Sequence, residues 1–329
     1  SSLRVRAMLR RRVFQFRPLV RWCQGASEGA HVDTWLQEAR QHFGEGRLQE
    51  CIASNLEVAK WAGQNPGVAK TVWQKVAGAH LNAAFALKLA GDFAEAITQA
   101  EEGMRLLQQH FSQHKRWVAH ALVLRGECRL EIARRSPDQR QAMVQAAEED
   151  LNQAIHLHVT ADGPDHPDLV GPLILLGMVK LETNTADAKK MLADALRIAV
   201  QTCAEEDKWP AEAGIALRRY AEALEMEEDL GSAIPFAEKA LDVFEKVVGP
   251  GDALVAEALI HVGALRVRAG WPAEAQPHLQ RALAICGGKL EVENQLTQEC
   301  VKWIMECDSE PRAQIAISPH ALVTIMQFL

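Results

Sequence analysis

The sequence has few aromatic residues and no long hydrophobic segment. Aromatic side chains make up 5% of the 329 residues, and Tyr220 is the single tyrosine. No stretch approaches the roughly 18 uncharged apolar residues expected of a membrane-spanning helix, so we expect no membrane span. The apolar fraction of 48% and the charged fraction of 24% are ordinary for a globular chain.

Motifs of common active sites are also missing. The sequence contains no GxGxxG, GxxxxGK[ST] or GxSxG pattern. His110 and His114 are four residues apart, but Phe111 stands where a zinc metalloprotease needs a glutamate. His156 and His158 are two residues apart and therefore point to different sides of a helix. We predict a non-enzymatic protein with no catalytic residue, no cofactor and no metal site.

The cysteines show no pairing pattern. There are seven, an odd number, with wide spacings and no CxxC. Neither a disulfide framework nor a zinc site is indicated, so we expect buried free thiols.

Small residues recur at a nearly constant distance. The first series has separations of 42, 51, 44 and 42 residues, and comprises Ala84, Gly126, Gly177, Ala221 and Gly263. A second series has separations of 51, 41, 45 and 42 residues, and comprises Gly103, Ala154, Ala195, Ala240 and Ala282. Two interleaved series with one period predict stacked helical hairpins, because neighbouring helices approach closely only where a side chain is nearly absent.

The resulting prediction is an all-α solenoid of about six stacked helical hairpins over residues 31–288. Turns are expected at glycine and at polar positions, namely residues 44–46, 91–92, 134–138, 184, 228–230 and 270–272. The 51-residue spacing is attributed to an insertion of about nine residues next to the 134–138 turn. A capping helix is expected within residues 289–309, followed by an apolar tail, residues 310–329, that packs on the solenoid or on a neighbour.

The chain resembles tetratricopeptide repeat proteins, most closely the 42-residue subtype of kinesin light chains. The segment from Ala90 to Ala96, AGDFAEA, is repeated as AGWPAEA from Ala269 to Ala275. The loop GPDHP at residues 163–167 is similar to the inter-repeat loop of that subtype, which implies a loop-packing role for His166. The resemblance covers about residues 33–285. It implies the fold, a right-handed superhelical solenoid, rather than a particular function.

The resemblance also implies that the first helix of each hairpin lines a concave groove. On this basis we expect a protein-binding groove lined by His120, Val123, Glu127, Leu130, Ile174, Met178, Leu181, Arg218, Glu222, Glu225, Glu257, Ile260, Ala264 and Arg268. Apolar residues ringed by acids suit a basic amphipathic helix as partner. Family members that hold a terminal carboxylate use lysine, arginine and asparagine, a set that this groove lacks.

Charge is distributed unevenly along the chain. Residues 1–27 contain no lysine and no acid but seven arginines, Arg4, Arg6, Arg10, Arg11, Arg12, Arg17 and Arg21. The segment carries +7 in a chain of net charge −7, so the rest carries −14. An arginine-rich, acid-free, amphipathic composition indicates a mitochondrial targeting segment, residues 1–30. Acidic clusters at 148–150, 205–207 and 225–229 are interpreted as solvated faces.

These patterns favour a scaffold subunit of a large mitochondrial assembly, such as a respiratory complex or the ATP synthase, in the matrix or on the matrix side of the membrane. A mitochondrial ribosome or RNA-processing component is an alternative, in which only the arginine-rich segment would contact RNA. A soluble adaptor or assembly factor that binds client proteins is another.

Overall fold

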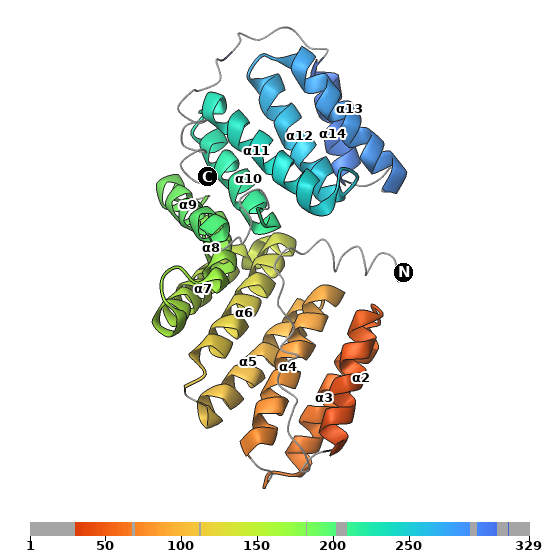
Figure 1. Ribbon diagram of the computed structural model, residues 1–329, viewed down its shortest axis with the longest axis vertical. Helices are drawn as coiled ribbons and strands as arrows, with labels where there is room; N and C mark the ends of the chain where they lie inside the picture. The colour runs from red at the N-terminus through yellow and green to blue at the C-terminus, as the bar shows by residue number, and fades with distance from the viewer. Residues whose placement is uncertain are drawn as a thin grey trace. The chain divides into compact units, whose positions relative to one another are not determined.

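The computed structural model describes residues 30–67, 70–111, 113–181, 183–201, 209–289, 295–307 and 315. These residues form thirteen α-helices and no strand, which confirms the predicted all-α class. The chain divides into two compact units, Ser1–Pro172 and Leu173–Leu329 (Figure 1). Each unit is a series of helical hairpins, and the two helices of each hairpin pack together.

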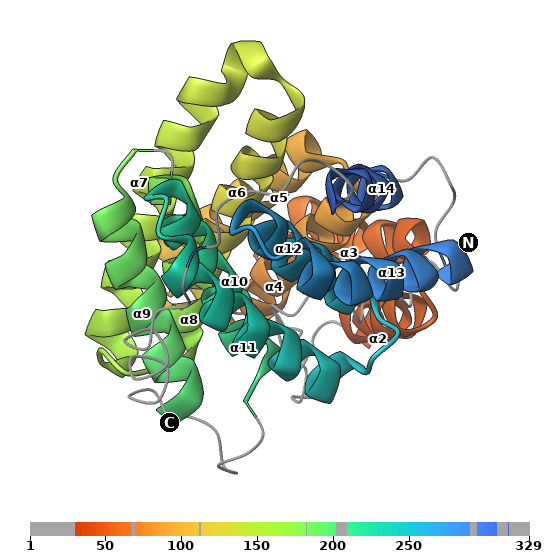
Figure 2. The ribbon, with the colours of Figure 1, turned by 90° about the horizontal axis from the view of Figure 1, so that it is seen from above.

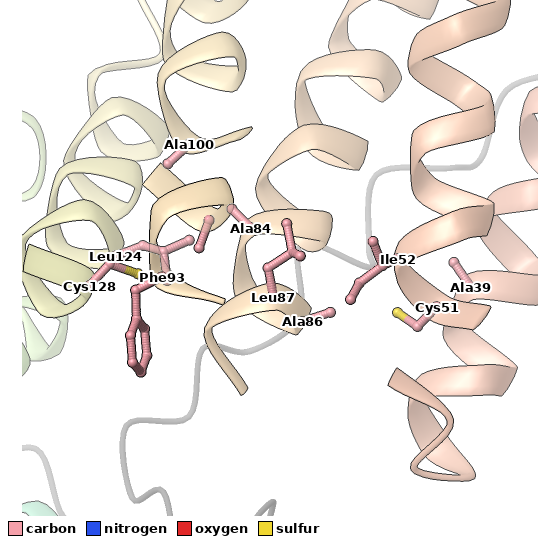
Figure 3. Packing of buried hydrophobic residues seen from close by; sticks show 11 residues of the cluster. Ala39, Cys51, Ile52, Ala84, Ala86, Leu87, Phe93, Ala100, Leu124 and Cys128 are labelled. Carbon is pink, nitrogen blue, oxygen red and sulfur yellow. The ribbon is translucent and has the colours of Figure 1, made fainter. Parts of the chain in front are cut away.

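The first unit contains three hairpins. Hairpin 1 is α2–α3, hairpin 2 is α4–α5 and hairpin 3 is α6–α7. Their bounds are α2 Ala30–Gly44, α3 Leu48–Gln64, α4 Lys70–Ala90, α5 Phe93–His110, α6 Lys115–Arg135 and α7 Arg140–Asp162. A continuous apolar core joins α2 to α6 (Figure 3), with members that include Ile52, Ala84, Phe93 and Leu124. A short 3-10 helix, η3 (Pro167–Leu169), leads into α8.

The second unit, which begins within α8, has the same pattern. Hairpin 4 is α8–α9, hairpin 5 is α10–α11 and hairpin 6 is α12–α13. The bounds are α8 Val170–Leu181, α9 Thr185–Gln201, α10 Ala211–Met226, α11 Leu230–Val248, α12 Ala253–Arg268 and α13 Pro272–Lys289. The predicted capping helix is α14 (Gln295–Cys307), which packs on α12 and α13. Its Cys300 is buried, and the thiol donates to the carbonyl oxygen of Leu279 at 3.0 Å.

The small-residue series marks the close contacts inside hairpins, as predicted. A Cβ atom added to Gly263 would lie 2.6 Å from Leu279, and one added to Gly177 would lie 2.8 Å from Leu192. At Gly126 the corresponding distance, to Leu151, is 3.4 Å. Where the first helix carries an alanine instead, the position equivalent to these leucines is also alanine. The pairs are Ala84 with Ala100 and Ala221 with Ala237, and all four are buried.

The turns follow local backbone rules. Gly91 and Gly270 adopt φ values of 91° and 82°, the left-handed conformation that ends their helices. Asp92 then begins α5, since its carboxylate accepts from the backbone N–H of Glu95 at 3.3 Å. In hairpin 5 the same conformation falls on Glu228, with φ 62°, and Asp229 is the N-cap of α11. Glutamate therefore occupies a position that glycine fills elsewhere.

The extra residues of hairpin 3 do not form the insertion beside the turn that the sequence predicted. Only a short 3-10 turn, η2 (Pro137–Gln139), separates α6 from α7, so the extra residues lengthen both helices instead of forming an inserted loop. Figure 2 shows the ends of these two helices projecting beyond α5. Residues 140–146 contain no glycine or proline, and so the helix continues through them.

Candidate functional site

Ion pairs join the first helices of consecutive hairpins in the first unit. The Lys75 ammonium on α4 lies 2.7 Å from the Asp33 carboxylate on α2. Lys88 on α4 pairs with Glu127 on α6, and the Lys88 side chain is only 4% exposed. The paired residues are 42 and 39 positions apart, which is about one repeat. Each pair therefore fixes the spacing between adjacent first helices.

The second unit repeats this arrangement between α10 and α12. Arg218 donates to Glu257 at 2.8 Å. Glu225 contacts both the His261 ring, at 3.1 Å, and the Arg268 guanidinium. These side chains are 14–33% exposed, so they form a partly solvated face held by its own charges. We call the first-helix surfaces that carry these pairs the paired-charge faces.

The predicted groove residues fall into two groups. Five apolar positions are buried against their neighbours, namely Val123, Ile174, Leu181, Ile260 and Ala264. Leu130 and Met178 are half-buried. All four predicted glutamates have a basic partner, because Glu127, Glu225 and Glu257 pair across hairpins and Glu222 pairs with Arg219 at 2.6 Å. The acids are thus balanced within the protein, which removes the argument for a basic amphipathic helix as partner.

A buried charge network in hairpin 3 was missed by the sequence reasoning. Asp150 accepts from Arg125 at 2.6 and 3.0 Å and from Arg129 at 2.7 Å, and its side chain is 4% exposed. Its place in the acidic cluster 148–150 suggested a solvated residue, and that interpretation is wrong for Asp150. Glu101 on α5 adds a second acceptor, 3.0 Å from Arg125. A buried carboxylate needs such partners because an unpaired charge is costly to bury.

Histidine and aspartate side chains meet at the corner where α7 ends and η3 begins. His158 and Asp162 lie four residues apart on α7, and Asp168 comes from η3. One ligand atom from each of the three lies within 4.8 Å of the others. The His120 ring on α6 is 4.9 Å from the His158 ring between centroids, and its Nε2 is 3.4 Å from Asp168. We call these four residues the corner cluster.

The corner cluster has unsatisfied polar atoms. Both ring nitrogens of His158 are buried without a hydrogen-bond partner, and so is Oδ2 of Asp162, 3.8 Å from Nδ1 of His158. A buried polar group left in this state costs about 1–3 kcal/mol. His156, two residues earlier, is exposed, which agrees with the expectation that His156 and His158 point apart. The pattern that could have revealed the cluster is the four-residue spacing of His158 and Asp162.

The cluster also has shifted protonation equilibria. Burial lowers the pKa of His158 to about 4, and the nearby His120 adds to the shift. For Asp168, burial acts to raise the pKa, but the hydrogen bond from His120 and the Arg116 guanidinium hold it well below its usual range. At neutral pH the corner therefore combines a neutral His158 imidazole with an ionised Asp168 carboxylate.

His166 has the loop-packing role that the resemblance implied. Its Nδ1 accepts from the backbone N–H of Asp168 at 3.2 Å, and so caps η3. Five cysteines fall among the described residues and all are free thiols, four of them buried, as expected. Burial raises the pKa of Cys51 and of Cys300 to about 11, which makes both thiols unreactive.

Several predicted features lie wholly or mostly outside the described residues. The seven N-terminal arginines and the acidic cluster 205–207 are among them. Of the apolar tail, Ile315 is described. Its backbone N–H donates to the carbonyl of Ala269 at 2.9 Å, and its carbonyl accepts from the Trp271 ring at 2.9 Å. At this residue the tail packs on the α12–α13 turn of its own chain.

Hairpins 5 and 6 of the second unit coincide with a match to a known repeat family. The family model of the tetratricopeptide repeat matches residues 212–287, from α10 to α13. The stretch from α10 to α13 is therefore built of tetratricopeptide repeats. The search of curated proteins finds no match. In the part of the chain that the structure describes, every helix is too short or too polar to span a bilayer.

Solved structures share this fold at low sequence identity. BtubC (BKLC) from P. vanneervenii is 16% identical, with a TM-score of 0.59 over 82% of this chain and 96% of that chain. A Podosopora anserina putative kinesin light chain with nearly identical TPR-like repeats is 16% identical, with a TM-score of 0.50 over 64% and 93%. A Rap protein complexed with competence and sporulation factor is 12% identical, with a TM-score of 0.57 over 92% and 84%. The fold is thus that of a tetratricopeptide repeat array.

Proposed function

We propose that the protein is a non-enzymatic scaffold subunit of a large mitochondrial assembly and binds protein partners through its paired-charge faces. The observation that supports this most is the set of ion pairs between consecutive first helices. Side chains that are already fixed by such pairs lose little conformational freedom when a partner binds, which favours a stable interface. A tetratricopeptide repeat fold is typical of interaction scaffolds.

The mitochondrial location rests on composition. Seven arginines, no acid and interspersed apolar residues within 1–27 are typical of import signals. A respiratory complex or the ATP synthase is the assembly that we favour. The proposal predicts that the full chain is imported into isolated mitochondria in a membrane-potential-dependent way. A variant with all seven arginines changed to glutamine should stay outside and be degraded by added protease.

The interaction surface can be tested by exchanging charges. The double variant Arg218→Glu with Glu257→Arg keeps an ion pair between α10 and α12 but reverses the charges offered to a partner. We expect affinity purification from mitochondria to yield stoichiometric partners with the native chain and much less with this variant. The matched control is Glu245→Arg with Arg281→Glu, which exchanges a pair between the second helices α11 and α13.

Each outcome distinguishes the proposed function from its alternatives. Co-migration with an inner-membrane complex on native gels supports a scaffold subunit. Salt-sensitive RNA binding that disappears with residues 1–30 would instead favour the ribosomal or RNA-processing role. Equal partner recovery by the native chain and both charge-exchange variants would contradict binding through the paired-charge face.

A transient adaptor is the second candidate. The Rap protein structure, complexed with competence and sporulation factor, has the same fold. An adaptor of this kind would show reversible, substoichiometric binding rather than co-migration with a complex.

A further inference from the structure

The corner cluster brings together ligand types that metal ions use. His158 and Asp162 are on one face of α7, because residues four apart in a helix lie one above the other. Asp168 reaches the same point from η3, and the ligand atoms of the three residues lie within 4.8 Å of one another. Imidazole nitrogen with two carboxylate oxygens is a donor set suited to Zn²⁺ and related divalent ions.

His158 supplies an independent indication of a ligand. Its side chain is 0% exposed, and neither ring nitrogen has a hydrogen-bond partner. Buried polar side chains are nearly always satisfied by protein or by a bound species. An ion between His158, Asp162 and Asp168 would satisfy the imidazole and the buried Asp162 oxygen together.

The fold does not need these polar residues. Ala154 and Ala240 occupy equivalent positions, so His158 corresponds to Phe244 and Asp162 to Val248 at the end of α11. Both helices end at a glycine with a positive φ, 93° at Gly163 and 85° at Gly249. The same corner is therefore built in hairpin 5 from two apolar residues, and His158 and Asp162 call for an explanation other than backbone geometry.

We propose that the corner cluster binds one divalent transition-metal ion, with Zn²⁺ as the favoured ion. His158, Asp162 and Asp168 are the protein ligands, and His120 stands beside the remaining position. The ion would tie the C-terminus of α7 to the start of α8. From the sequence we expected no metal site, because the spacing of His158 to His156 conceals the neighbouring position of Asp162.

When no ion is bound, the positive charge of Arg116 neutralises the carboxylates that would otherwise bind the metal. Its guanidinium lies 2.6 Å from Asp168 and 3.8 Å from Asp162. The Arg116 side chain is 43% exposed, so it can turn into solvent when an ion takes the two carboxylates. Arginine and metal therefore compete, and removing the arginine should tighten metal binding.

The test is a titration of the metal-free full-length chain with Zn²⁺ at neutral pH, followed by calorimetry. We expect one ion per chain beyond the background of other histidines, and the double variant His158→Phe with Asp162→Val should lose this one ion. That variant copies the residues of the α11 corner and should fold, which circular dichroism would verify. His156→Ala, on the same helix but exposed, should bind as the native chain does.

Arg116→Gln gives a second readout in the opposite direction. Its affinity for Zn²⁺ should rise about tenfold, and Zn²⁺ should raise its melting temperature more than that of the native chain. Co²⁺ in place of Zn²⁺ should give a visible absorption band that is absent in the double variant. Equal stoichiometry in the native chain and the double variant, or no gain in affinity for Arg116→Gln, would overturn the proposal.

Discussion

Hairpins 3 and 5 have the same two-helix architecture, but the interior of hairpin 3 is charged and that of hairpin 5 is aromatic and apolar. In hairpin 3, Arg125 on α6 pairs with Asp150 on α7. The equivalent positions in hairpin 5 are Tyr220 and Phe236, whose rings stack with centroids 4.6 Å apart. At the next corner His158 and Asp162 correspond to Phe244 and Val248.

The two hairpins show which positions the helix packing requires and at which positions the interior side chains can differ. Both hairpins keep a small residue on the first helix, Gly126 or Ala221, and a glycine after the second helix. Between these fixed points, an ion-paired interior and an aromatic interior support the same helix packing. Charged residues inside hairpin 3 are consequently candidates for specificity or for ligand binding rather than for fold formation.

The largest expected effect comes from breaking the charged interior. Asp150→Ala leaves Arg125 and Arg129 in a largely buried site with Glu101 as their remaining acidic partner. We expect a loss of about 3 kcal/mol in the free energy of unfolding, measured by urea denaturation followed by circular dichroism. Glu101→Ala is the matched control, since its side chain is 48% exposed, and should cost less than about 1 kcal/mol.

A double variant that carries the residues of hairpin 5 tests whether the two interiors are interchangeable. The double variant Arg125→Tyr with Asp150→Phe should lose less stability than Asp150→Ala, because it removes the charges together. A double variant less stable than Asp150→Ala would mean that hairpin 3 depends on its ion pair, and the equivalence of the two interiors would not hold.

The next effect concerns the small-residue contacts. Gly263→Ala places a Cβ 2.6 Å from the Leu279 side chain, which is fully buried and would have to shift. We expect a loss of about 2 kcal/mol from overpacking. Gly126→Ala should cost much less, because its Cβ would lie 3.4 Å from Leu151. In a Leu279→Ala background the cost of Gly263→Ala should disappear, and a double-mutant cycle measures this coupling.

A pH-dependent effect is expected on the paired-charge face of α10 and α12. Burial acts to raise the pKa of Glu225, but the hydrogen bond from His261 and the charge of Arg268 lower it overall. A lowered folded-state pKa gives stability that is present above the unfolded pKa and lost as the pH falls through the folded value. Glu225→Gln should therefore be less stable than the native chain at pH 7 by about 1 kcal/mol.

The difference in unfolding free energy between the native chain and Glu225→Gln should shrink on acidification. It should vanish once Glu225 is protonated in the folded state, below the ordinary glutamate pKa of about 4.3. Urea denaturation at several pH values between 7 and 3 measures this. Asp242→Asn, at a more exposed ion pair within α11, is the control. A difference that stays constant with pH would show that Glu225 acts through packing rather than through its charge.

The smallest expected effect is a gain in stability. Glu228 has φ 62°, where hairpins 2 and 6 have Gly91 and Gly270. Glu228→Gly should stabilise the protein by roughly 0.5–1 kcal/mol, because glycine adopts this conformation without a steric penalty. The converse substitution, Gly91→Ala, should destabilise it by a similar amount, and thermal unfolding can compare the two. A loss of stability in Glu228→Gly would indicate that the Glu228 side chain makes a stabilising contact.

Part of the candidate site could have been predicted from the sequence. The cross-hairpin pairs Lys88–Glu127 and Arg218–Glu257 are each 39 residues apart, and Glu225–Arg268 are 43 apart. Opposite charges separated by one repeat, at equivalent positions, are a readable signal of neighbouring first helices. The corner cluster was harder to foresee, because Asp168 joins it only through the fold of the 162–168 loop.

The sequence by itself determined the hairpins, their turns and their close contacts, since helix ends and small-residue contacts depend on residues near in the chain or one repeat away. Only the tertiary structure decided which charges are buried. Asp150 and Glu149 are adjacent in one acidic cluster, yet Asp150 is buried and Glu149 exposed. The reason is that a helix turns about 100° per residue, so the fate of each charge depends on which face α6 covers.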